Sequence, residues 1–215
     1  MTALMDAVRY REQGWSLIPM KMSTKTPAVR WKRYQKAIAD EVRLRKWFDS
    51  DRGYGLAVIY GEISGGLASR DFDNLGSYER WATGHPDLAE KLPTVETRRG
   101  RHVYCRFVAD DVADFRRRIG KPDGWGAICC EGGELRAGVG CYSVIPNSQH
   151  PSGFVYCWTK SPFDVPIPTL TVAESGFFVP RATEITEETE DIEETEAIGE
   201  VGKKMSVKET RSLTF

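Results

Sequence analysis

Two aspartates, Asp71 and Asp73, are separated by one residue at the end of an apolar stretch that is typical of a buried strand. Side chains alternate along a strand, so both carboxylates are expected on one face, about 7 Å apart by the strand rise. Such carboxylates repel each other unless a cation lies between them, and Mg²⁺ accepts one or two carboxylates together with substrate phosphates. The pair indicates a divalent-metal site, although a solvated turn with a capping aspartate would give the same pattern.

A second segment, residues 97–102, gathers glycine and basic side chains around one histidine. His102 follows Gly100 and Arg101 where a strand is expected to start. Glycine lets backbone amides approach an anion, and arginine and histidine bind phosphate oxygens. The segment indicates a phosphate site, and a tight hairpin with exposed arginines remains open as the alternative.

A third group begins at Glu134, which follows two glycines and opens a short strand that also contains Arg136. The next apolar strand runs into residues 146–153, a loop of proline, serine, histidine and glycine that includes Ser148 and His150. Such a loop can surround an anion, but proline and glycine are equally expected in a plain hairpin connection. Taken with the aspartates, these residues predict a site at which carboxylates hold two metals and a triphosphate is received.

The apolar periodicity predicts the elements that must position these residues. Helices are expected at 2–13, at 40–48, in a stretch from Asn74 that Pro86 must break, and at 111–119. Strands are expected at 15–19, 54–60, 67–72, 94–97, 102–108, 127–130, 134–136, 141–145 and 154–158. An α/β half is thus followed by a mostly antiparallel half, which is an α+β pattern.

Composition places the chain among cytoplasmic globular proteins. Hydrophobic residues make up 40% of the 215 residues and no long apolar run suggests a membrane span or a signal peptide. The five cysteines lack paired spacing, so we expect reduced thiols and no zinc site. The tryptophans at 31, 47, 81 and 125 are expected to pack in or beside the core rather than to serve as base-stacking platforms.

Charged residues are distributed unevenly along the chain. The net charge is −1 overall, yet residues 181–200 carry nine acidic residues against Arg181. We expect one domain over residues 1–175, mildly basic as suits a protein that meets phosphates, and an acidic, disordered linker or tail over 176–215. The acidic run favours a fragment of a longer protein, and no P-loop motif is present.

The order and spacing of these motifs resemble the archaeo-eukaryotic primase superfamily, specifically the primase–polymerase domains of plasmid, phage and prophage replication proteins. The resemblance covers roughly residues 3 to 160, and its ordered set of motifs is more specific than any one of them. The segments that carry it are Lys25-Thr-Pro27 with Trp31, Leu67 to Asp73, Gly100-Arg101-His102, Glu134, and Pro146-Asn-Ser148-Gln-His150.

The resemblance implies an N-terminal α/β unit packed on an RRM-like antiparallel-sheet unit, with the active site in the cleft between them. Asp71, Asp73 and Glu134 would bind Mg²⁺ or Mn²⁺. The triphosphate would meet His102, Ser148, His150, Arg101 and Arg136. In some relatives a lysine follows the last histidine motif, but here residues 151–153 are Pro-Ser-Gly, so part of the phosphate-binding charge must come from elsewhere.

The function implied is a DNA primase/polymerase of mobile-element replication, acting on a single-stranded DNA template with NTP or dNTP. The resemblance also implies a helicase, in cis or in trans, as a further partner. It implies no interaction with a membrane. Two alternatives stay open. A metal-dependent nuclease also needs clustered carboxylates, and a catalytically inactive module could bind single strands without synthesis.

Overall fold

The computed structural model describes residues 2–49 and 52–181, and one compact unit spans Met1–Val179. A first sheet has four antiparallel strands in the order β2-β1-β3-β9. Its strands are β1 (Ser16–Lys21), β2 (Thr26–Pro27), β3 (Gly55–Ile59) and β9 (Tyr142–Val144).

A second sheet of seven strands has the order β10-β5-β6-β4-β8-β7, and β11 pairs in parallel with β6. All its other pairings are antiparallel. The strands are β4 (Leu67–Phe72), β5 (Thr94–Glu96), β6 (Arg101–Phe107), β7 (Ile128–Cys130), β8 (Gly133–Ala137), β10 (Cys157–Lys160) and β11 (Thr169–Leu170).

The helices begin where the sequence offers a capping side chain. Thr2 Oγ1 accepts from the Met5 N–H at 3.3 Å, Asp40 Oδ1 from Arg43 at 2.7 Å, and Asn74 Oδ1 from Ser77 at 2.9 Å. The helices are α1 (Ala3–Glu12), α2 (Glu41–Phe48), α3 (Leu75–Gly84), α4 (Pro86–Lys91), α5 (Ala109–Arg118) and α6 (Val172–Ser175), with 3₁₀ turns η1 (Trp31–Gln35) and η2 (Glu62–Ser64).

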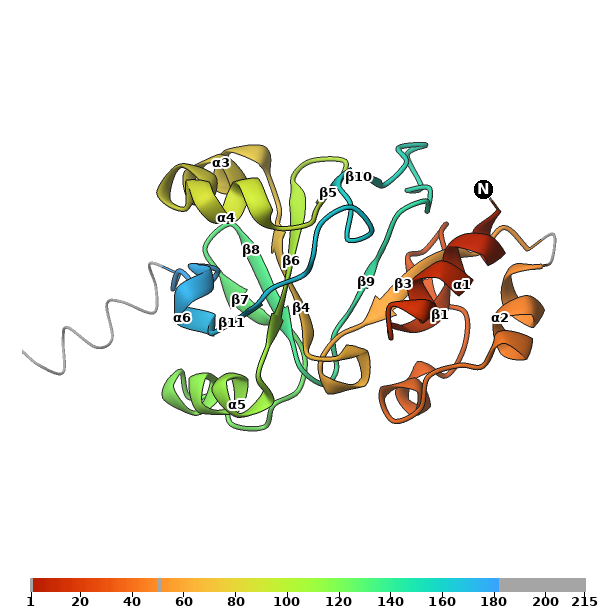
Figure 1. Ribbon diagram of the computed structural model, residues 1–215, viewed down its shortest axis with the longest axis horizontal. Coiled ribbons are helices and arrows are strands. Elements are labelled where there is room, and N and C mark those ends of the chain that lie inside the picture. The colour runs from red at the N-terminus through yellow and green to blue at the C-terminus, as the bar shows by residue number, and fades with distance from the viewer. Residues whose placement is uncertain (1, 50–51, 182–215) are drawn as a thin grey trace, which may run out of the picture. The chain divides into compact units, whose positions relative to one another are not determined.

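The central strand β4 has two different faces because its side chains alternate. Ala68 and Phe72 pack into a buried apolar cluster with residues of α3, α5 and α6. Figure 1 shows these helices on one side of the second sheet, with β9 and the first sheet on the other. Ser69 and Asp71 therefore face away from the helices, toward the first sheet.

An aromatic core joins the two sheets. Trp15 is fully buried and stacks on Tyr10 of α1 and Tyr104 of β6, with ring centroids 5.1 and 6.2 Å apart. Trp158 of β10 lies 5.1 Å from Tyr104, and its indole N–H donates to the Tyr10 hydroxyl at 2.7 Å. Because these rings come from α1, from the residue before β1 and from the second sheet, packed side chains join the N-terminal elements to the second sheet.

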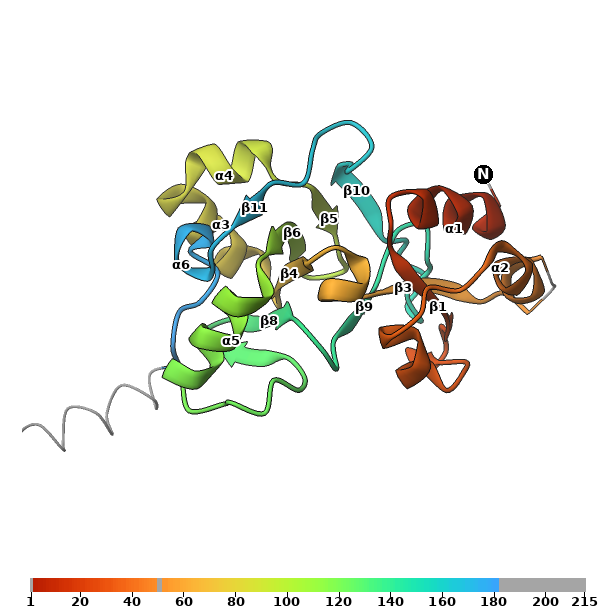
Figure 2. The ribbon, with the colours of Figure 1, turned by 60° about the horizontal axis from the view of Figure 1, so that its bottom comes forward.

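The predicted α+β class is confirmed, with antiparallel sheets and helices, but the predicted division into two successive halves is wrong. β4 comes from the first half and forms the centre of the second sheet, whereas β9 comes from the second half and pairs with β3 in the first. In Figures 1 and 2, β9 runs beside β3, away from β7 and β8. Apolar periodicity identifies strands but not their partners, because pairing depends on residues far apart in sequence.

The structure also differs from the prediction in the position of some smaller elements. The strand expected at 154–158 is instead β10, shifted toward its C-terminal end, and residues 21–37, for which no helix or strand is predicted, contain β2 and η1. None of the five cysteines, which all lie in the described part of the chain, forms a disulfide. Most of the predicted acidic tail, residues 182–215, lies outside the described residues. Within residues 2–49 and 52–181 no helix has the length and apolar character needed to cross a membrane.

Candidate active site

Register brings three predicted site residues into one row across the second sheet. Asp71 on β4 pairs with His102 on β6 and with Glu134 on β8. Directly opposite residues of antiparallel strands point to the same face, with Cβ atoms about 5 Å apart. The three side chains therefore share the face of the sheet opposite to the one that α3, α5 and α6 cover.

Arg136, two residues after Glu134, lies on the same face and joins the carboxylates. Its Nη2 atom is 2.6 Å from Glu134 Oε2 and 3.2 Å from Asp71 Oδ2, and its Nη1 donates to the Tyr142 carbonyl at 3.0 Å. His102 Nε2 is 3.2 Å from the other Asp71 oxygen, Oδ1. Each oxygen of Asp71 thus has a partner, and the guanidinium bridges two carboxylates.

Asp71 and His102 of this row, together with Arg136, line a polar cavity of about 190 Å³. Both sheets contribute to its wall, together with one lysine from the loop between β1 and β2. The lining residues are Met20, Lys25, Asp71, His102, Arg136, Tyr142, Ser143, Val144 and Tyr156. Three buried polar atoms of these lining residues, His102 Nδ1, Arg136 Nε and Ser143 Oγ, have no hydrogen-bond partner in the described protein. Buried polar atoms are nearly always satisfied, so the cavity is chemically suited to a polar ligand or water.

The electrostatics of the row hold Asp71 ionised. Burial alone would raise its pKa, but the contacts with His102 and Arg136 outweigh burial and place the pKa well below its ordinary value of 3.8. A carboxylate with a depressed pKa stabilises the fold at pH values above its unfolded-state pKa. That stabilisation is lost as the pH falls from about 4 toward the folded-state pKa.

We therefore expect Asp71→Asn to reduce the pH dependence of stability on the acid side. The free energy of unfolding of wild type should fall more steeply than that of the variant below about pH 4, because only wild type must protonate this carboxylate. Urea unfolding at a series of pH values measures both curves. Parallel curves over that range would show that the ion pairs of Asp71 do not contribute to stability.

The predicted loop residues Ser148 and His150 have different surroundings. Ser148 is 2% exposed, and its hydroxyl accepts from the Leu56 N–H at 2.8 Å and contacts the Leu56 carbonyl at 3.2 Å. These two bonds fasten the loop to β3, and because the single hydroxyl proton is donated to the Leu56 carbonyl, none is left to donate to a phosphate. His150 is partly exposed, and its Nδ1 lies 2.9 Å from Ser152 Oγ.

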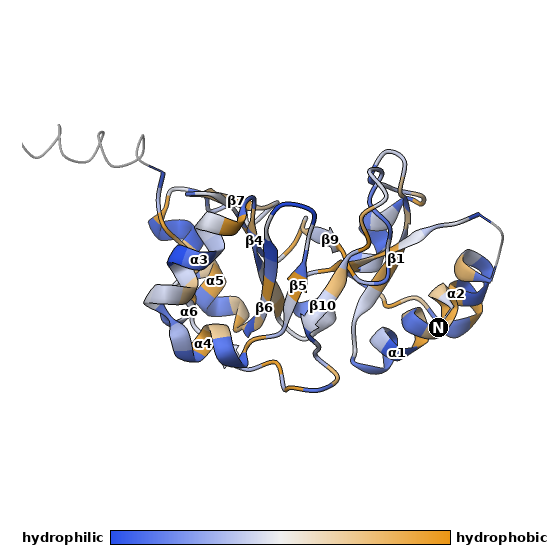
Figure 3. Cartoon of the chain, turned by 90° about the horizontal axis from the view of Figure 1, so that it is seen from above, coloured by the Kyte–Doolittle hydropathy of each residue, from blue (hydrophilic) through white to orange (hydrophobic). Residues whose placement is uncertain are grey.

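A cationic region surrounds His150. Partial burial lowers the pKa of its imidazole, and the positive charges of Lys25, Arg98 and Arg99 lower it further. The two arginines lie in the turn between β5 and β6, which Figure 3 shows as strongly hydrophilic. Three cations near one histidine would attract an anion such as a triphosphate.

Two predicted residues lie apart from the row. β4 ends at Phe72, so Asp73 is already past the strand: its N–H donates to the Gly132 carbonyl at 2.9 Å and its side chain is exposed. Arg101 precedes His102 on β6 and so faces the opposite side, where its guanidinium is 3.2 Å from Glu96 Oε1. The structure brings together Asp71, Glu134, His102 and Arg136, and leaves Asp73 and Arg101 outside that group.

Lys25 is a site residue that sequence reasoning did not single out. It is exposed, lines the cavity and has a left-handed backbone with φ of 54°, a conformation that non-glycine residues rarely adopt. No salt bridge occupies its ammonium among the described residues. The signal was present in Lys25-Thr-Pro27, which resembled the opening of a known family but had no assigned role.

The residues present fit a divalent cation only in part. Within residues 2–49 and 52–181 no three acidic, histidine or cysteine side chains already converge as a metal cage. Asp71 and Glu134, however, already share one cationic group, Arg136, and a Mg²⁺ site needs only one or two carboxylates when substrate phosphates supply other ligands. The donor set suits a cation that arrives with a nucleotide.

Comparison with known proteins adds one finding. The model of the family described as bifunctional DNA primase/polymerase, N-terminal, matches residues 7–173. That range contains every residue of the row and the cationic region. No curated protein sequence matches the chain.

Proposed function

Since this chain belongs to the bifunctional DNA primase/polymerase family through its N-terminal-type domain, we propose that it is a template-dependent nucleotidyltransferase. It adds NTP or dNTP to a growing strand and releases pyrophosphate. The observation that carries the proposal is the row of Glu134, Asp71 and His102, in which Asp71 and His102 line a polar cavity that Lys25 also lines, and Glu134 is joined to it through Arg136. A carboxylate can bind a metal ion and cations can bind phosphate, so these groups together suit a triphosphate that arrives with a bound metal ion.

Each group in the cavity receives a role from its position. Asp71 and Glu134, with Asp73 at the end of β4, would hold Mg²⁺ or Mn²⁺. Bound metal ions supply activation of the attacking hydroxyl and stabilisation of charge on the pyrophosphate. His102 and Arg136 orient the Asp71 carboxylate through their contacts with its two oxygens.

The triphosphate is assigned to the cationic region. Lys25, His150, Arg98 and Arg99 supply the charge that the Pro-Ser-Gly sequence after His150 does not. Ser148 acts indirectly in this proposal, because its bonds to Leu56 hold the loop that carries His150. The second sheet is proposed as the RRM-like unit of the family, and the cavity between the sheets as its active-site cleft.

The wider context is proposed from the family and from charge. The catalytic domain, expected over residues 1–175, is proposed to extend to the end of the compact unit at Val179, where Phe177 is buried, and the acidic linker or tail is proposed to follow it. A helicase, attached or separate, opens the template during replication of a mobile element. The supporting observation is the excess of acidic residues over 181–200, typical of solvated linkers.

Incorporation of labelled nucleotide on a single-stranded template tests the proposal, with and without a primer, in Mg²⁺ and in Mn²⁺. Metal-dependent extension of a primer is the expected result, and products without primer would show priming. A shortened template would favour the metal-dependent nuclease. Template binding without any product would favour the inactive binding module.

Nucleotide binding should depend on Lys25. Lys25→Gln is expected to weaken the binding of NTP with Mg²⁺ by about tenfold or more, because a charge-assisted hydrogen bond contributes about 1.5–3 kcal/mol. The shift of the melting temperature with nucleotide concentration measures this. Lys46→Gln on α2 is the matched control, since Lys46 is also exposed. Equal shifts for both variants would remove Lys25 from the phosphate site.

A further inference from the structure

The segment between β1 and α2 is strongly basic. Residues 21–39 contain six cationic and no acidic side chains, and all six cations are exposed. They are Lys21, Lys25, Arg30, Lys32, Arg33 and Lys36. The segment begins beside the cavity, where Lys25 lies, and continues into η1. A run of unopposed positive charge along the surface attracts a phosphate backbone.

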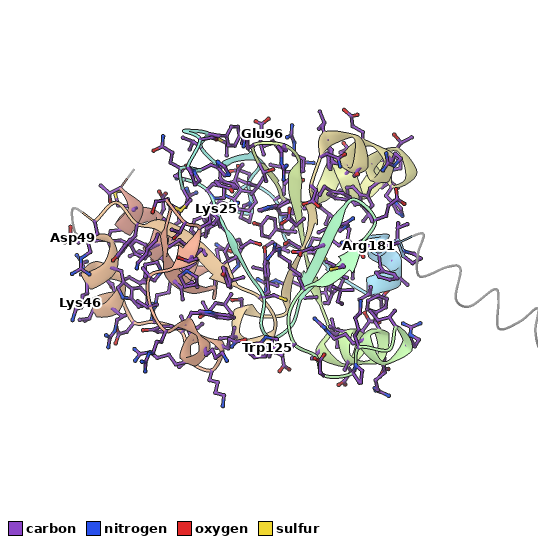
Figure 4. All side chains as sticks on the ribbon, turned by 180° about the vertical axis from the view of Figure 1, so that it is seen from behind. Lys25, Lys46, Asp49, Glu96, Trp125 and Arg181 are labelled. Carbon is purple, nitrogen blue, oxygen red and sulfur yellow. The ribbon has the colours of Figure 1, made fainter. Side chains whose placement is uncertain are left out.

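An aromatic path leads outward from the same cavity. Tyr142, which lines it, meets Trp31 of η1 edge to face with ring centroids 5.0 Å apart. Trp31 in turn lies 6.4 Å from Trp125, whose surface is 48% exposed. The Lys32 ammonium lies over the Trp125 ring, 5.2 Å from its centroid. Figure 4 labels Lys25 and Trp125 along the seam between the two sheets, Trp125 at its lower edge.

The exposed indole is held in place by its neighbours. A Cβ added at Gly140 would come within 2.8 Å of the Trp125 ring, so the ring lies directly on that backbone. Gly126 N–H donates to the Val139 carbonyl at 3.0 Å, and Gly140 N–H donates to Gln35 Oε1 at 2.6 Å. The indole and η1 are thus both tied to the turn that precedes β9.

We propose that Trp125, with Trp31 and Lys32, is a stacking site for a base of the single-stranded template outside the active site. This rests on the proposed function, because the template is the polymer that must reach the cavity. Bases of single strands stack on aromatic side chains, while basic residues follow the phosphates. A held, half-exposed indole beneath an ammonium and beside a basic segment presents both features.

We assign single-stranded rather than duplex nucleic acid to this stacking site because of what the indole can contact. Bases of a duplex are stacked on each other and offer only their edges in the grooves, whereas an unpaired base offers its face. A protein partner is disfavoured by the six exposed cations without an acidic residue among them. The path from Trp125 through Trp31 to Tyr142 ends at the cavity, which is where a templating base would be needed.

The test measures binding of a short fluorescein-labelled oligodeoxythymidylate by anisotropy. Trp125→Ala is expected to raise the Kd by about tenfold, and Trp125→Phe by much less, because a ring is retained. Lys32→Gln should reduce the dependence of binding on salt by about 0.7 in the log–log slope for each lost phosphate contact. Lys46→Gln should leave that slope unchanged. Melting of each variant verifies its fold, and if Trp125→Ala does not fold, the Lys32 slope decides.

The outcomes separate this inference from the proposed function. If wild type incorporates nucleotide but the Trp125→Ala protein and the Lys32→Gln protein bind the oligonucleotide as wild type does, the inference is overturned and the proposed function stands. If wild type neither incorporates nucleotide nor binds the oligonucleotide, both fail. Equally strong competition by duplex DNA would overturn the assignment to a single strand.

Discussion

Asp71→Asn is expected to reduce nucleotide incorporation by about a hundred- to a thousandfold, the scale on which single electrostatic groups act in catalysis. Asparagine keeps the shape of the side chain but removes the charge that His102 and Arg136 contact. Arg136 would keep its 2.6 Å contact with Glu134, so the row would stay assembled. Glu134→Gln should have a comparable effect, since it removes the second carboxylate of the pair. Primer extension in Mg²⁺ measures both.

The matched control is Asp114→Asn. Asp114 lies on α5, on the other side of the second sheet, and its side chain is 59% exposed. Incorporation by this variant should equal that of wild type, which would show that losing an aspartate charge is harmless elsewhere. Extension at the wild-type rate by the Asp71 or the Glu134 variant, with the fold intact, would show that the site has been misassigned.

Trp15→Ala is expected to lower the free energy of unfolding by about 3–5 kcal/mol, the range for deleting a buried aromatic ring. Trp15 is 0% exposed and contacts rings from α1, β6 and β10, so its loss leaves a cavity between the sheets. Because the active-site cavity has walls from both sheets, incorporation should fall as well. Urea unfolding gives the energy.

Trp125→Ala is the comparison for that experiment. The same change at a half-exposed ring should cost only about 1 kcal/mol, the usual size of a substitution effect. A similar loss from both variants would mean that Trp15 does not hold the sheets together. Near-wild-type stability of Trp15→Ala would mean that neighbouring rings close the cavity.

Local patterns in the sequence were sufficient to predict the helices and strands that carry the site. Apolar runs and capping residues located β4 and the starts of α1, α2 and α3, because strand periodicity and capping are properties of neighbouring residues. The row of Asp71, His102 and Glu134 could be suspected from motif order alone. Their adjacency follows from the β4–β6 and β4–β8 registers, which no local pattern encodes.

The remaining site residues show where sequence reasoning fails. Asp73 was expected beside Asp71 on one strand face, but the strand ends at Phe72 and a single residue of difference at a boundary moves a side chain into solvent. The Ser148 hydroxyl is occupied by Leu56, a residue far away in sequence. Trp125 was expected to pack in or beside the core; its ring rests on the Gly140 backbone with 48% of the residue exposed, a placement that its sequence neighbours do not encode.

The pairing of β3 with β9 has a consequence for synthesis of the chain on the ribosome. Ala57 pairs with Val144, so the first sheet is incomplete until residue 144 has left the exit tunnel. Closing so long a loop costs entropy before any pairing is gained, and proteins rich in such pairings fold slowly. Until then the nascent β3 has a free edge that could pair with another chain. Translation pauses before residue 144 should therefore increase aggregation, whereas pauses after β9 has emerged should not.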